Sequence, residues 1–365
     1  MESQLSLPTE AMRQWIFELW RAAGSCEQEA RLTADHLVGA NLAGHDSHGV
    51  GMVGRYVRSL QAGGLQLNQR LAIVTDTGSL VVVDGKGGMG QSMAFQTMEL
   101  AVERARRHGV AIVGLRQSHH LGRVGHWAEQ AMAAGLASIH FTNVVGKPSV
   151  APHGGRQSRL GTNPLTIGLP RRQGPPILLD FASAAIALGK VAVARSRKTQ
   201  VPPGALIDHL GRPTTDPSVM YDEPLGALLP AAGHKGYALG MVCDLLGSAL
   251  FGGLLPPLKP GLAGFYNDML TVVFDPGRLG SGEQFEREAS AYIDYVRSAE
   301  RTDPDAAIEI PGDFERRCRA ERAEALPLDP GTLRGLDEAA RAINALRGSA
   351  LTPASSLAIQ GRGPC

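Results

Sequence analysis

Two short clusters of histidine, serine and glycine carry the side chains best suited to chemistry. Asp46-Ser47-His48-Gly49 places a carboxylate, a hydroxyl and an imidazole within four residues. Ser118-His119-His120-Leu121-Gly122 is similar and has two imidazoles. Imidazole has the ordinary pKa that best suits proton transfer near neutral pH. Each cluster therefore fits a general acid or base, although a hydrogen-bonded histidine in a structural turn is the competing interpretation.

The same histidines raise the question of a metal. His45 and His48 are spaced three apart, and His119, His120 and His126 add further donors. No HExxH pattern or carboxylate-bearing zinc motif surrounds them, and the four cysteines form no CxxC pair. We therefore expect no metal site.

Further polar clusters stand where ligands commonly bind. Lys235 follows Gly233-His234 at the start of an apolar helix, where free N–H groups and the helix dipole favour an anion. A Schiff-base role for Lys235 finds no other support. Leu160–Pro164 and Asp180–Ser183 come at the ends of predicted strands, where α/β sheets place ligands. Asp180 could bind a ribose or cap the next helix.

One glycine-rich turn matches a dinucleotide fingerprint. Gly85–Gly90 satisfies G-x-G-x-x-G between a predicted strand and a helix. The next strand ends at Leu115-Arg116-Gln117, without the acidic residue that holds a ribose hydroxyl, although an arginine there suits a 2′-phosphate. A tight turn that packs a helix on a sheet is the alternative, and the residues alone leave both open.

The elements that must position these clusters alternate along the chain. Apolar residues at helical spacing begin at Met12 and end before Gly24, and strands then alternate with helices from residue 80 onward. This order predicts an α/β fold. Helices are expected near 9–23, 28–42, 91–107, 126–134, 235–250, 285–296 and 333–343, strands near 80–83, 110–115, 137–141, 165–169, 177–179 and 270–274, and mostly loop at 195–217.

Length and composition agree with such an enzyme. The chain has 365 residues, which predicts two or three lobes. Glycine supplies 45 residues, about 12% against a usual share of about 7%, as in a fold with many tight turns. The net charge of +1 provides no overall electrostatic attraction to nucleic acid or to an anionic membrane. The apolar stretch 237–258 contains Asp244 and two prolines, so we expect a buried helix ending near Gly252. Scattered cysteines and a polar start predict a cytoplasmic protein.

Taken together, the motifs resemble those of the malate/L-lactate dehydrogenase family, which includes ureidoglycolate, sulfolactate, 2,3-diketogulonate and Δ1-piperideine-2-carboxylate enzymes. The resemblance covers roughly residues 5–345 and rests on nine motifs in the family's order. They are Asp46–Val50, Asp84-Gly85 with Gly90-Gln91, Ser118–Gly122, Phe141–Asn143, Leu160–Pro164, Leu179-Asp180 with Gly189-Lys190, Pro213–Pro217, His234–Tyr237 and Pro311–Asp313.

The resemblance implies a non-Rossmann NAD(P)-binding α/β fold, with a mixed sheet and flanking helices, and Gly85–Gly90 as a structural turn. It implies catalysis by His48, with Ser47 as its partner and His120 as the second histidine. Thr142 and Asn143, with Arg55 and Met52, would contact the substrate. NAD or NADP would bind at Asp180, Phe181, Ala182, Ser183, His234, Lys235, Pro311, Gly312 and Asp313, in a homodimer or larger even oligomer.

Several positions depart from the family pattern. Met52 stands where an arginine commonly holds the substrate carboxylate, and methionine cannot form that bidentate contact. Arg55 is the candidate to replace it. Val144, His119, Asp313 and Ala205 stand where a polar residue, asparagine, glutamate and tryptophan are common. A simple lactate or malate specificity is therefore not expected.

The expected activity is hydride transfer between nicotinamide and a 2-oxo acid, a cyclic imino acid or their reduced forms. A basic run is formed by Arg195, Arg197 and Lys198. It either favours the 2′-phosphate of NADP or is simply part of a solvated loop. The alternatives are a Rossmann hydroxyacid dehydrogenase using Gly85–Gly90, a cofactor-binding protein without turnover, and, last, a metal-dependent hydrolase.

The expected parts are a helical segment 1–75, an α/β part 76–143, a cofactor lobe 144–280, a helical segment 281–347 and a mobile or loosely docked tail 348–365.

Overall fold

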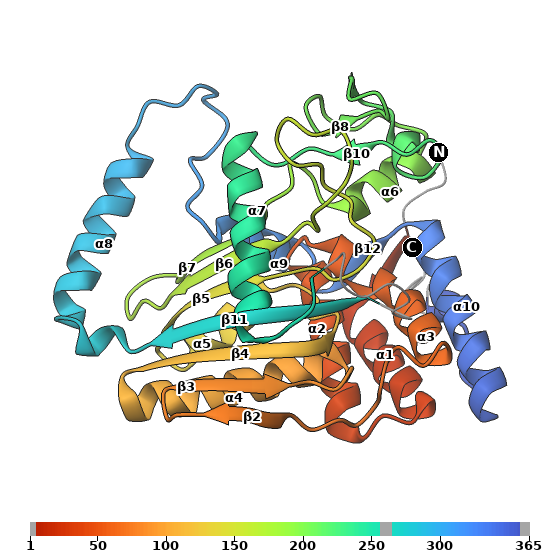
Figure 1. The fold of residues 1–365 in the computed structure, drawn as a ribbon, viewed down its shortest axis with the longest axis horizontal. Coiled ribbons are helices and arrows are strands. Elements are labelled where there is room, and N and C mark those ends of the chain that lie inside the picture. The colour runs from red at the N-terminus through yellow and green to blue at the C-terminus, as the bar shows by residue number, and fades with distance from the viewer. Residues whose placement is uncertain (1–4, 256–264, 358–365) are drawn as a thin grey trace, which may run out of the picture.

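A seven-stranded mixed sheet forms the centre of the computed structural model, which describes residues 5–255 and 265–357 (Figure 1). Its strand order is β2-β3-β4-β11-β5-β6-β7, and only β3 and β4 run parallel. The α/β expectation is therefore confirmed. The strands are β2 (Ala72–Asp76), β3 (Leu80–Asp84), β4 (Val110–His119), β5 (Ala137–Thr142), β6 (Pro164–Leu169), β7 (Ile177–Ala182) and β11 (Tyr266–Phe274).

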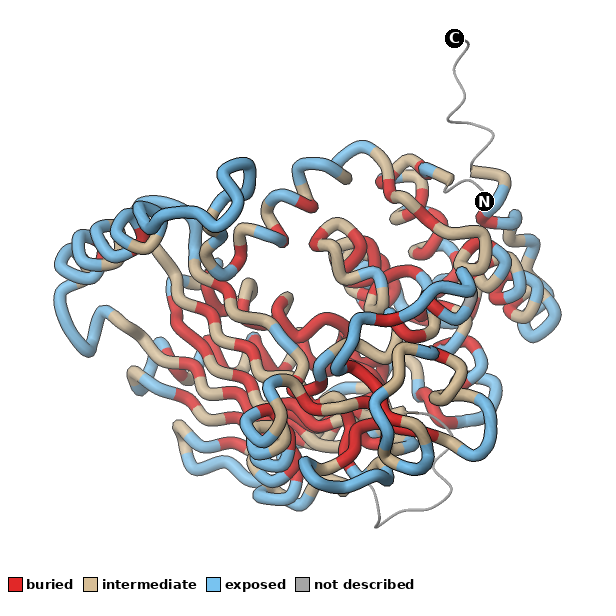
Figure 2. Tube along the Cα trace, turned by 90° about the horizontal axis from the view of Figure 1, so that it is seen from above, coloured by how far each residue is buried: buried red, intermediate tan, exposed pale blue. Residues whose placement is uncertain are grey.

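Helices cover both faces of this sheet. α4 (Gly90–His108) and α5 (Gly125–Ala133) pack on one face over a core that includes Met98, Val113 and Trp127. α7 (His234–Gly247) crosses the other face in front of β5 and β11 (Figure 1). Figure 2 shows buried residues gathered in the interior of the molecule, where they alternate with partly buried ones along the strands. The two layers hold the strand ends rigidly, so they can position side chains for a site.

A separate helical core lies beside the sheet. Its helices are α1 (Thr9–Ala23), α2 (Glu27–Leu42), α3 (Val53–Gln61) and α10 (Pro330–Arg347). The predicted apolar stripe of α1 is buried, and Gly24 ends the helix with φ 109°, a conformation that favours glycine. β1 (Leu5–Pro8) pairs with β12 (Ala325–Leu328), so the two ends of the chain meet here.

The C-terminal tail also reaches this helical core. Trp15 Nε1 donates to the carbonyl of Thr352 at 2.8 Å, and Ala354 is fully buried in a short 3-10 turn (Ala354–Ser356). Residues 349–357 thus pack on α1 and α10, whereas the rest of the tail lies outside the described residues.

The remaining elements surround the loops. The predicted loop 195–217 contains the end of α6 (Leu188–Ser196) and two short strands, β8 (Leu206–Ile207) and β9 (Pro213–Thr214), which join β10 (Ala227–Leu228). α8 (Gly282–Arg297) stands at the edge of the molecule, and α9 (Asp313–Glu321) lies behind the sheet (Figure 1). Short 3-10 turns are η1 (Asp46–His48), η2 (Val50–Met52), η3 (Pro217–Met220), η4 (Ala249–Phe251) and η6 (Pro276–Arg278).

The prediction of a buried helix at 235–250 was wrong for one of its faces. Met241, Val242 and Leu245 are 46%, 39% and 45% exposed on the outer side of α7. The inner side packs on the sheet, where Gly247 approaches the backbone of Phe141. Among the described residues, no helix combines the length and the apolar character needed to cross a bilayer.

Candidate active site

The loop that carries Ser47 and His48 is held in place by polar contacts with α9 and α2. His45 Nε2 lies 3.0 Å from Glu315 on α9, and Asp46 accepts bonds from Asn41 at 2.6 Å and Arg322 at 2.8 Å. An added Cβ on Gly49 would come within 2.0 Å of the Asn41 side chain, so only glycine fits there. These contacts determine the position of η1.

His48 is held by its neighbour and by a close helix. Its Nδ1 lies 2.9 Å from Ser47 Oγ. Gly189, in α6, packs so closely that an added Cβ would lie 2.4 Å from Ser47 Cβ. Burial lowers the pKa of His48 to about 4, helped by the charges of His45, Arg123 and Arg55 and opposed by Asp180. His48 is therefore a neutral imidazole at pH 7 and can accept a proton.

His120 directly follows β4, and its ring lies against that of His48. The two rings are stacked, with centroids 5.7 Å apart and planes 18° apart. Burial, followed by the charges of His48, His119 and Arg55, lowers the pKa of His120 well below its ordinary value. The structure thus brings together all three residues predicted to be catalytic, although 72 positions separate the two histidines in the sequence.

Three residues that the sequence analysis had not assigned to the site surround His120. The hydroxyl of Tyr56, in α3, lies 2.7 Å from His120 Nδ1, and Gln91 Nε2, in α4, donates to that hydroxyl at 3.1 Å. The ring of Phe265 packs on His120 at 4.5 Å. Gln91 belonged to a recognised motif and Tyr56 follows Arg55 in the sequence, but no local pattern indicated that they meet.

The two candidates for the substrate carboxylate have different surroundings. Met52 is 7% exposed and belongs to the apolar core of the helical lobe. Arg55 is exposed, and its charge acts on His48, His120, Tyr56 and, from another lobe, Tyr221. Arg55 therefore lies where it can attract an anion toward both histidines.

Thr142 and Asn143 end β5 inside the protein. The Asn143 side chain accepts from the backbone of Asp268 at 2.9 Å and donates to the carbonyl of Leu254 at 2.8 Å. Its amide thus joins β11 to the loop after η4. Thr142 is 1% exposed, and its Oγ1 has no hydrogen-bond partner among the described residues.

The three predicted cofactor segments meet along β7, the edge strand of the sheet. The carbonyl of Pro311 accepts from Leu178 N at 3.2 Å near the start of β7. At its other end, Ser183 O accepts from Ala231 N at 2.8 Å, just before His234 and Lys235 begin α7. Segments that are far apart in the sequence therefore contact β7 at its two ends, and Phe181 between them is 39% exposed.

Two acidic side chains of these segments already have partners. Asp180 accepts from Gly125 N at 3.0 Å and Thr166 Oγ1 at 2.9 Å, and Arg123 lies 3.6 Å away. Asp313 pairs with Arg297 at 2.8 Å and Arg316 at 2.5 Å. Burial raises the pKa of Asp313, but hydrogen bonds from Ile310, Arg316 and Arg297 bring it down to about 2. These segments thus offer a ligand their backbone and the exposed His234 and Lys235 more than free carboxylates.

The glycine-rich turn Gly85–Gly90 is tied to the end of β4. Gly85 N and Gly87 N donate to Arg116 O and Gln117 O at 2.8 Å and 2.7 Å, and Gly88 N donates within the turn. An added Cβ on Gly90 would lie 1.9 Å from the carbonyl of His120. These N–H groups are not free for a pyrophosphate, and the glycines allow the turn to support the segment that carries His120.

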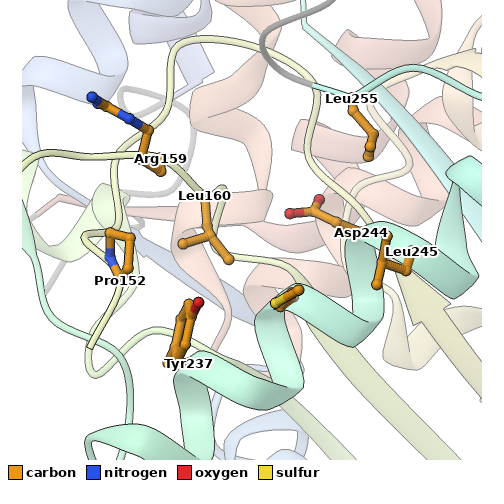
Figure 3. Close-up of a pocket in the computed structure, with 8 residues that line it drawn as sticks. Pro152, Arg159, Leu160, Tyr237, Asp244, Leu245 and Leu255 are labelled. Carbon is orange, nitrogen blue, oxygen red and sulfur yellow. The ribbon is translucent and has the colours of Figure 1, made fainter. Parts of the chain in front are cut away.

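A cavity of about 250 Å³ lies beside α7, and neither His48 nor His120 is among the residues that line it (Figure 3). Apolar side chains such as Tyr237, Met241 and Leu245 form most of its wall, with Asp244 and Arg159 as the charged members. Burial raises the pKa of Asp244 to about 6, which a hydrogen bond with Asn163 partly opposes, and its Oδ1 has no partner among the described residues.

The described residues contain no group of three or more histidine, cysteine, aspartate or glutamate side chains placed to hold a metal ion.

Arg195, from the predicted basic run, pairs with Asp222 at 2.7 Å and lies over the ring of Tyr221. Arg197 and Lys198, the other members of the run, are exposed like Arg195.

Comparisons with known proteins agree on one family. The family model described as malate/L-lactate dehydrogenase matches residues 7–337. Hydroxycarboxylate dehydrogenase B of Escherichia coli O157:H7 is 46% identical over 347 residues, covering 94% of this chain and 96% of the relative. A solved E. coli structure assigned as a malate/lactate dehydrogenase has a TM-score of 0.91 and 43% identity, covering 97% of this chain and 98% of that one. The Δ1-piperideine-2-carboxylate reductase of Pseudomonas syringae pv. tomato has a TM-score of 0.79 and 28% identity, covering 92% and 99%.

Proposed function

Because the chain belongs to the malate/L-lactate dehydrogenase family and is thus an oxidoreductase, we propose that His48 moves the proton in a nicotinamide-dependent reaction. The substrate is a 2-oxo acid or a cyclic imino acid, or its reduced form. The observation that carries this proposal is the stacked pair His48 and His120, at 5.7 Å, with Ser47 bonded to His48. Relatives that act on hydroxycarboxylates and on a cyclic imino acid support both substrate classes.

The neutral state of His48 suits the oxidation direction. Its imidazole can accept the proton of a 2-hydroxy acid as the carbon loses hydride, because its pKa of about 4 leaves the ring unprotonated at neutral pH. In reduction the ring must first take up a proton. A substrate carboxylate beside Arg55 offsets the positive charge that lowers the pKa of His48, so substrate binding itself favours that protonation.

NAD or NADP fits the surface along β7. We propose that Leu178–Ser183, the start of α7 and Pro311–Asp313 hold it, with Lys235 and the α7 N-terminus next to its phosphates. When bound, the nicotinamide supplies or accepts the hydride. The 2′-phosphate preference is testable by comparing KM for NADH and NADPH. Equal or better use of NADH contradicts a role of Arg197 and Lys198 in NADP selection.

The activity is tested with a panel of 2-oxo and cyclic imino acids, following consumption of NADH and NADPH. In the best pair, His48→Ala is expected to lower kcat by at least about 100-fold while cofactor affinity stays the same. His108→Ala, an exposed histidine at the end of α4, is the matched control and keeps full activity. Full turnover in His48→Ala contradicts the assigned role. A protein that binds the cofactor without turning over any substrate favours the alternative of a binding protein without redox activity.

We further propose that the active form is a homodimer covering the outer face of α7. Met241, Val242 and Leu245 expose an apolar stripe there. Beside it, the cavity in Figure 3 holds one acid, Asp244, and one base, Arg159. Such a face is charge-complementary to its own copy in a two-fold arrangement, so a second copy is the occupant that it fits.

We also expect a cytoplasmic location, where Cys26, Cys243 and Cys318, all free, remain reduced.

A further inference from the structure

We propose that Gln91 and Tyr56 are positioning residues that hold His120 in a single tautomer, with its proton on Nε2. His120 then acts as a fixed hydrogen-bond donor to the substrate while His48 exchanges the proton. This assignment concerns the second histidine of the site and rests on the proposed function only for its kinetic consequences. The tautomer itself follows from the contacts of three buried residues, Gln91, Tyr56 and His120.

The first step is the orientation of the Gln91 amide. Gln91 is completely buried, and its Nε2 lies 3.1 Å from Tyr56 Oη and 3.4 Å from the backbone carbonyl of His120. A carbonyl oxygen can only accept, so the amide nitrogen faces it, and the amide oxygen is the atom left without a partner among the described residues. Gln91 therefore donates a proton to the Tyr56 hydroxyl.

The second step follows from the single proton of the Tyr56 hydroxyl. Because Gln91 fills an acceptor position, the phenol proton must find its own acceptor, and His120 Nδ1 at 2.7 Å is the one that the described residues offer. The opposite direction, from Nδ1 to the hydroxyl, would leave a buried phenol proton unbonded, which is unfavourable. Burial raises the pKa of Tyr56 above its ordinary value, so the hydroxyl keeps its proton.

The third step places the remaining proton on His120. Since the ring is neutral and Nδ1 accepts, the N–H must be on Nε2. None of the described residues forms a hydrogen bond with Nε2, and His120 retains 8% exposure. The chain Gln91–Tyr56–His120 thus presents one N–H group at a fixed place beside His48.

A fixed donor suits the chemistry of the site. A neutral imidazole N–H can polarise the oxygen or nitrogen of the bond being reduced without exchanging its own proton. His48, bonded to Ser47, is then free to transfer the proton. Loss of one hydrogen bond that orients a functional histidine is expected to lower the rate by up to about 10-fold.

The direct test is selective ¹⁵N-histidine NMR of the full chain, with His120 assigned by comparison with His120→Gln. The expected spectrum shows His120 as the Nε2–H tautomer near neutral pH, and Tyr56→Phe turns it into a mixture of tautomers. A dominant Nδ1–H tautomer in the unmodified protein overturns the proposal. This readout needs no substrate, so it stands apart from the proposed enzymatic function.

The kinetic test is a double-mutant cycle. Tyr56→Phe removes one oxygen and is expected to lower kcat up to about 10-fold with little change in cofactor KM. In a His120→Gln background the same substitution should change kcat less than about twofold, because its partner is gone. Equal losses in both backgrounds contradict the proposal.

The same cluster offers a matched control. Ser59 Oγ lies 3.0 Å from His119 Nε2, so Ser59→Ala also removes a buried hydroxyl next to a histidine. It should leave kcat and the His120 tautomer unchanged. If Tyr56→Phe folds poorly, Gln91→Met tests the same chain from its other end: retained Nε2–H occupancy and full kcat in a folded Gln91→Met would overturn Gln91's part.

Discussion

Arg55 and Met52 lie three positions apart in the chain, and the fold gives them opposite surroundings. Met52 faces the apolar core of the helical lobe, while the charge of Arg55 acts on both His48 and His120. An arginine at position 52 would have to bury its guanidinium or displace α3. The carboxylate contact therefore belongs to Arg55 in our proposal.

Arg55→Gln tests this contact. Loss of a charge-assisted hydrogen bond should raise the KM of a carboxylate substrate by roughly 10-fold or more, with a smaller change in kcat. Arg58→Gln, an exposed arginine on the same helix, is the control and should behave like the unmodified enzyme. Steady-state kinetics with one substrate decide the matter, and equal KM values for the two variants would refute the role of Arg55.

The pH dependence follows from His48. Its neutral form exists above its pKa of about 4, so kcat/KM for oxidation should stay level from pH 8 to about 5 and decrease below that range. Reduction needs the protonated form, so its kcat/KM should decrease as pH rises through the same interval and above it. Initial rates in both directions over pH 4–9 provide the check. A loss of oxidation rate already between pH 8 and 6.5 would assign the proton to another group.

At the scale of elements, the loop of Ser47 and His48 depends on α2, α6 and α9. α9 contacts it through Glu315, α2 through Asn41, and α6 through the close approach of Gly189. None of these elements contributes a proton-transfer group. Their role is to keep a short, glycine-flanked 3-10 turn in one place.

Gly189→Ala should therefore reduce activity without unfolding the protein. The new methyl group would lie 2.4 Å from Ser47 Cβ, and a displacement of about 1 Å at a catalytic group can lower the rate by about 100-fold. Gly39→Ala, in the interior of α2 with open space around it, is the control, since alanine there stabilises a helix by about 0.5–1 kcal/mol. Thermal melts alongside kcat measurements separate the two effects; unchanged kcat in Gly189→Ala means that the contact is not needed.

At the scale of the whole molecule, the sheet is unequally covered. α4 and α5 cover one face, while α7 on the other face turns apolar side chains outward. Exposed apolar stripes of this kind commonly mark interfaces. The net charge of +1 gives two copies little electrostatic reason to repel one another.

The oligomer is tested by light scattering after gel filtration. The unmodified protein should elute with twice the chain mass of 38.6 kDa, and Met241→Glu should shift it to the monomer. Leu346→Glu on α10 changes a residue with the same 46% exposure far along the chain and should leave the mass unchanged. A monomeric unmodified protein, or a dimeric Met241→Glu, argues against this face.

The helices and strands that could be predicted from the sequence are those with a pattern among neighbouring residues. The stripe of α1 with its terminal glycine, and the alternation after residue 80, predicted helices and strands where they occur, because periodicity and caps depend on near neighbours. The strands β1, β2 and β12 and the helix α6 were not predicted. β1 pairs with a strand more than 300 positions away, and no short-range pattern encodes such a partner.

The sequence by itself determined which side chains are the candidates for the chemistry: His48, its neighbour Ser47, and His120 are recognisable from residue type and motif. Only the tertiary structure decided which groups lie together and which charges are already paired. Tyr56 reaches His120 across 64 positions, Asp180 lies beside Arg123 inside the protein, and Asp313 pairs with Arg297 nearer its surface. Burial and ion pairing depend on contacts between distant segments, so the state of each charge is a property of the fold.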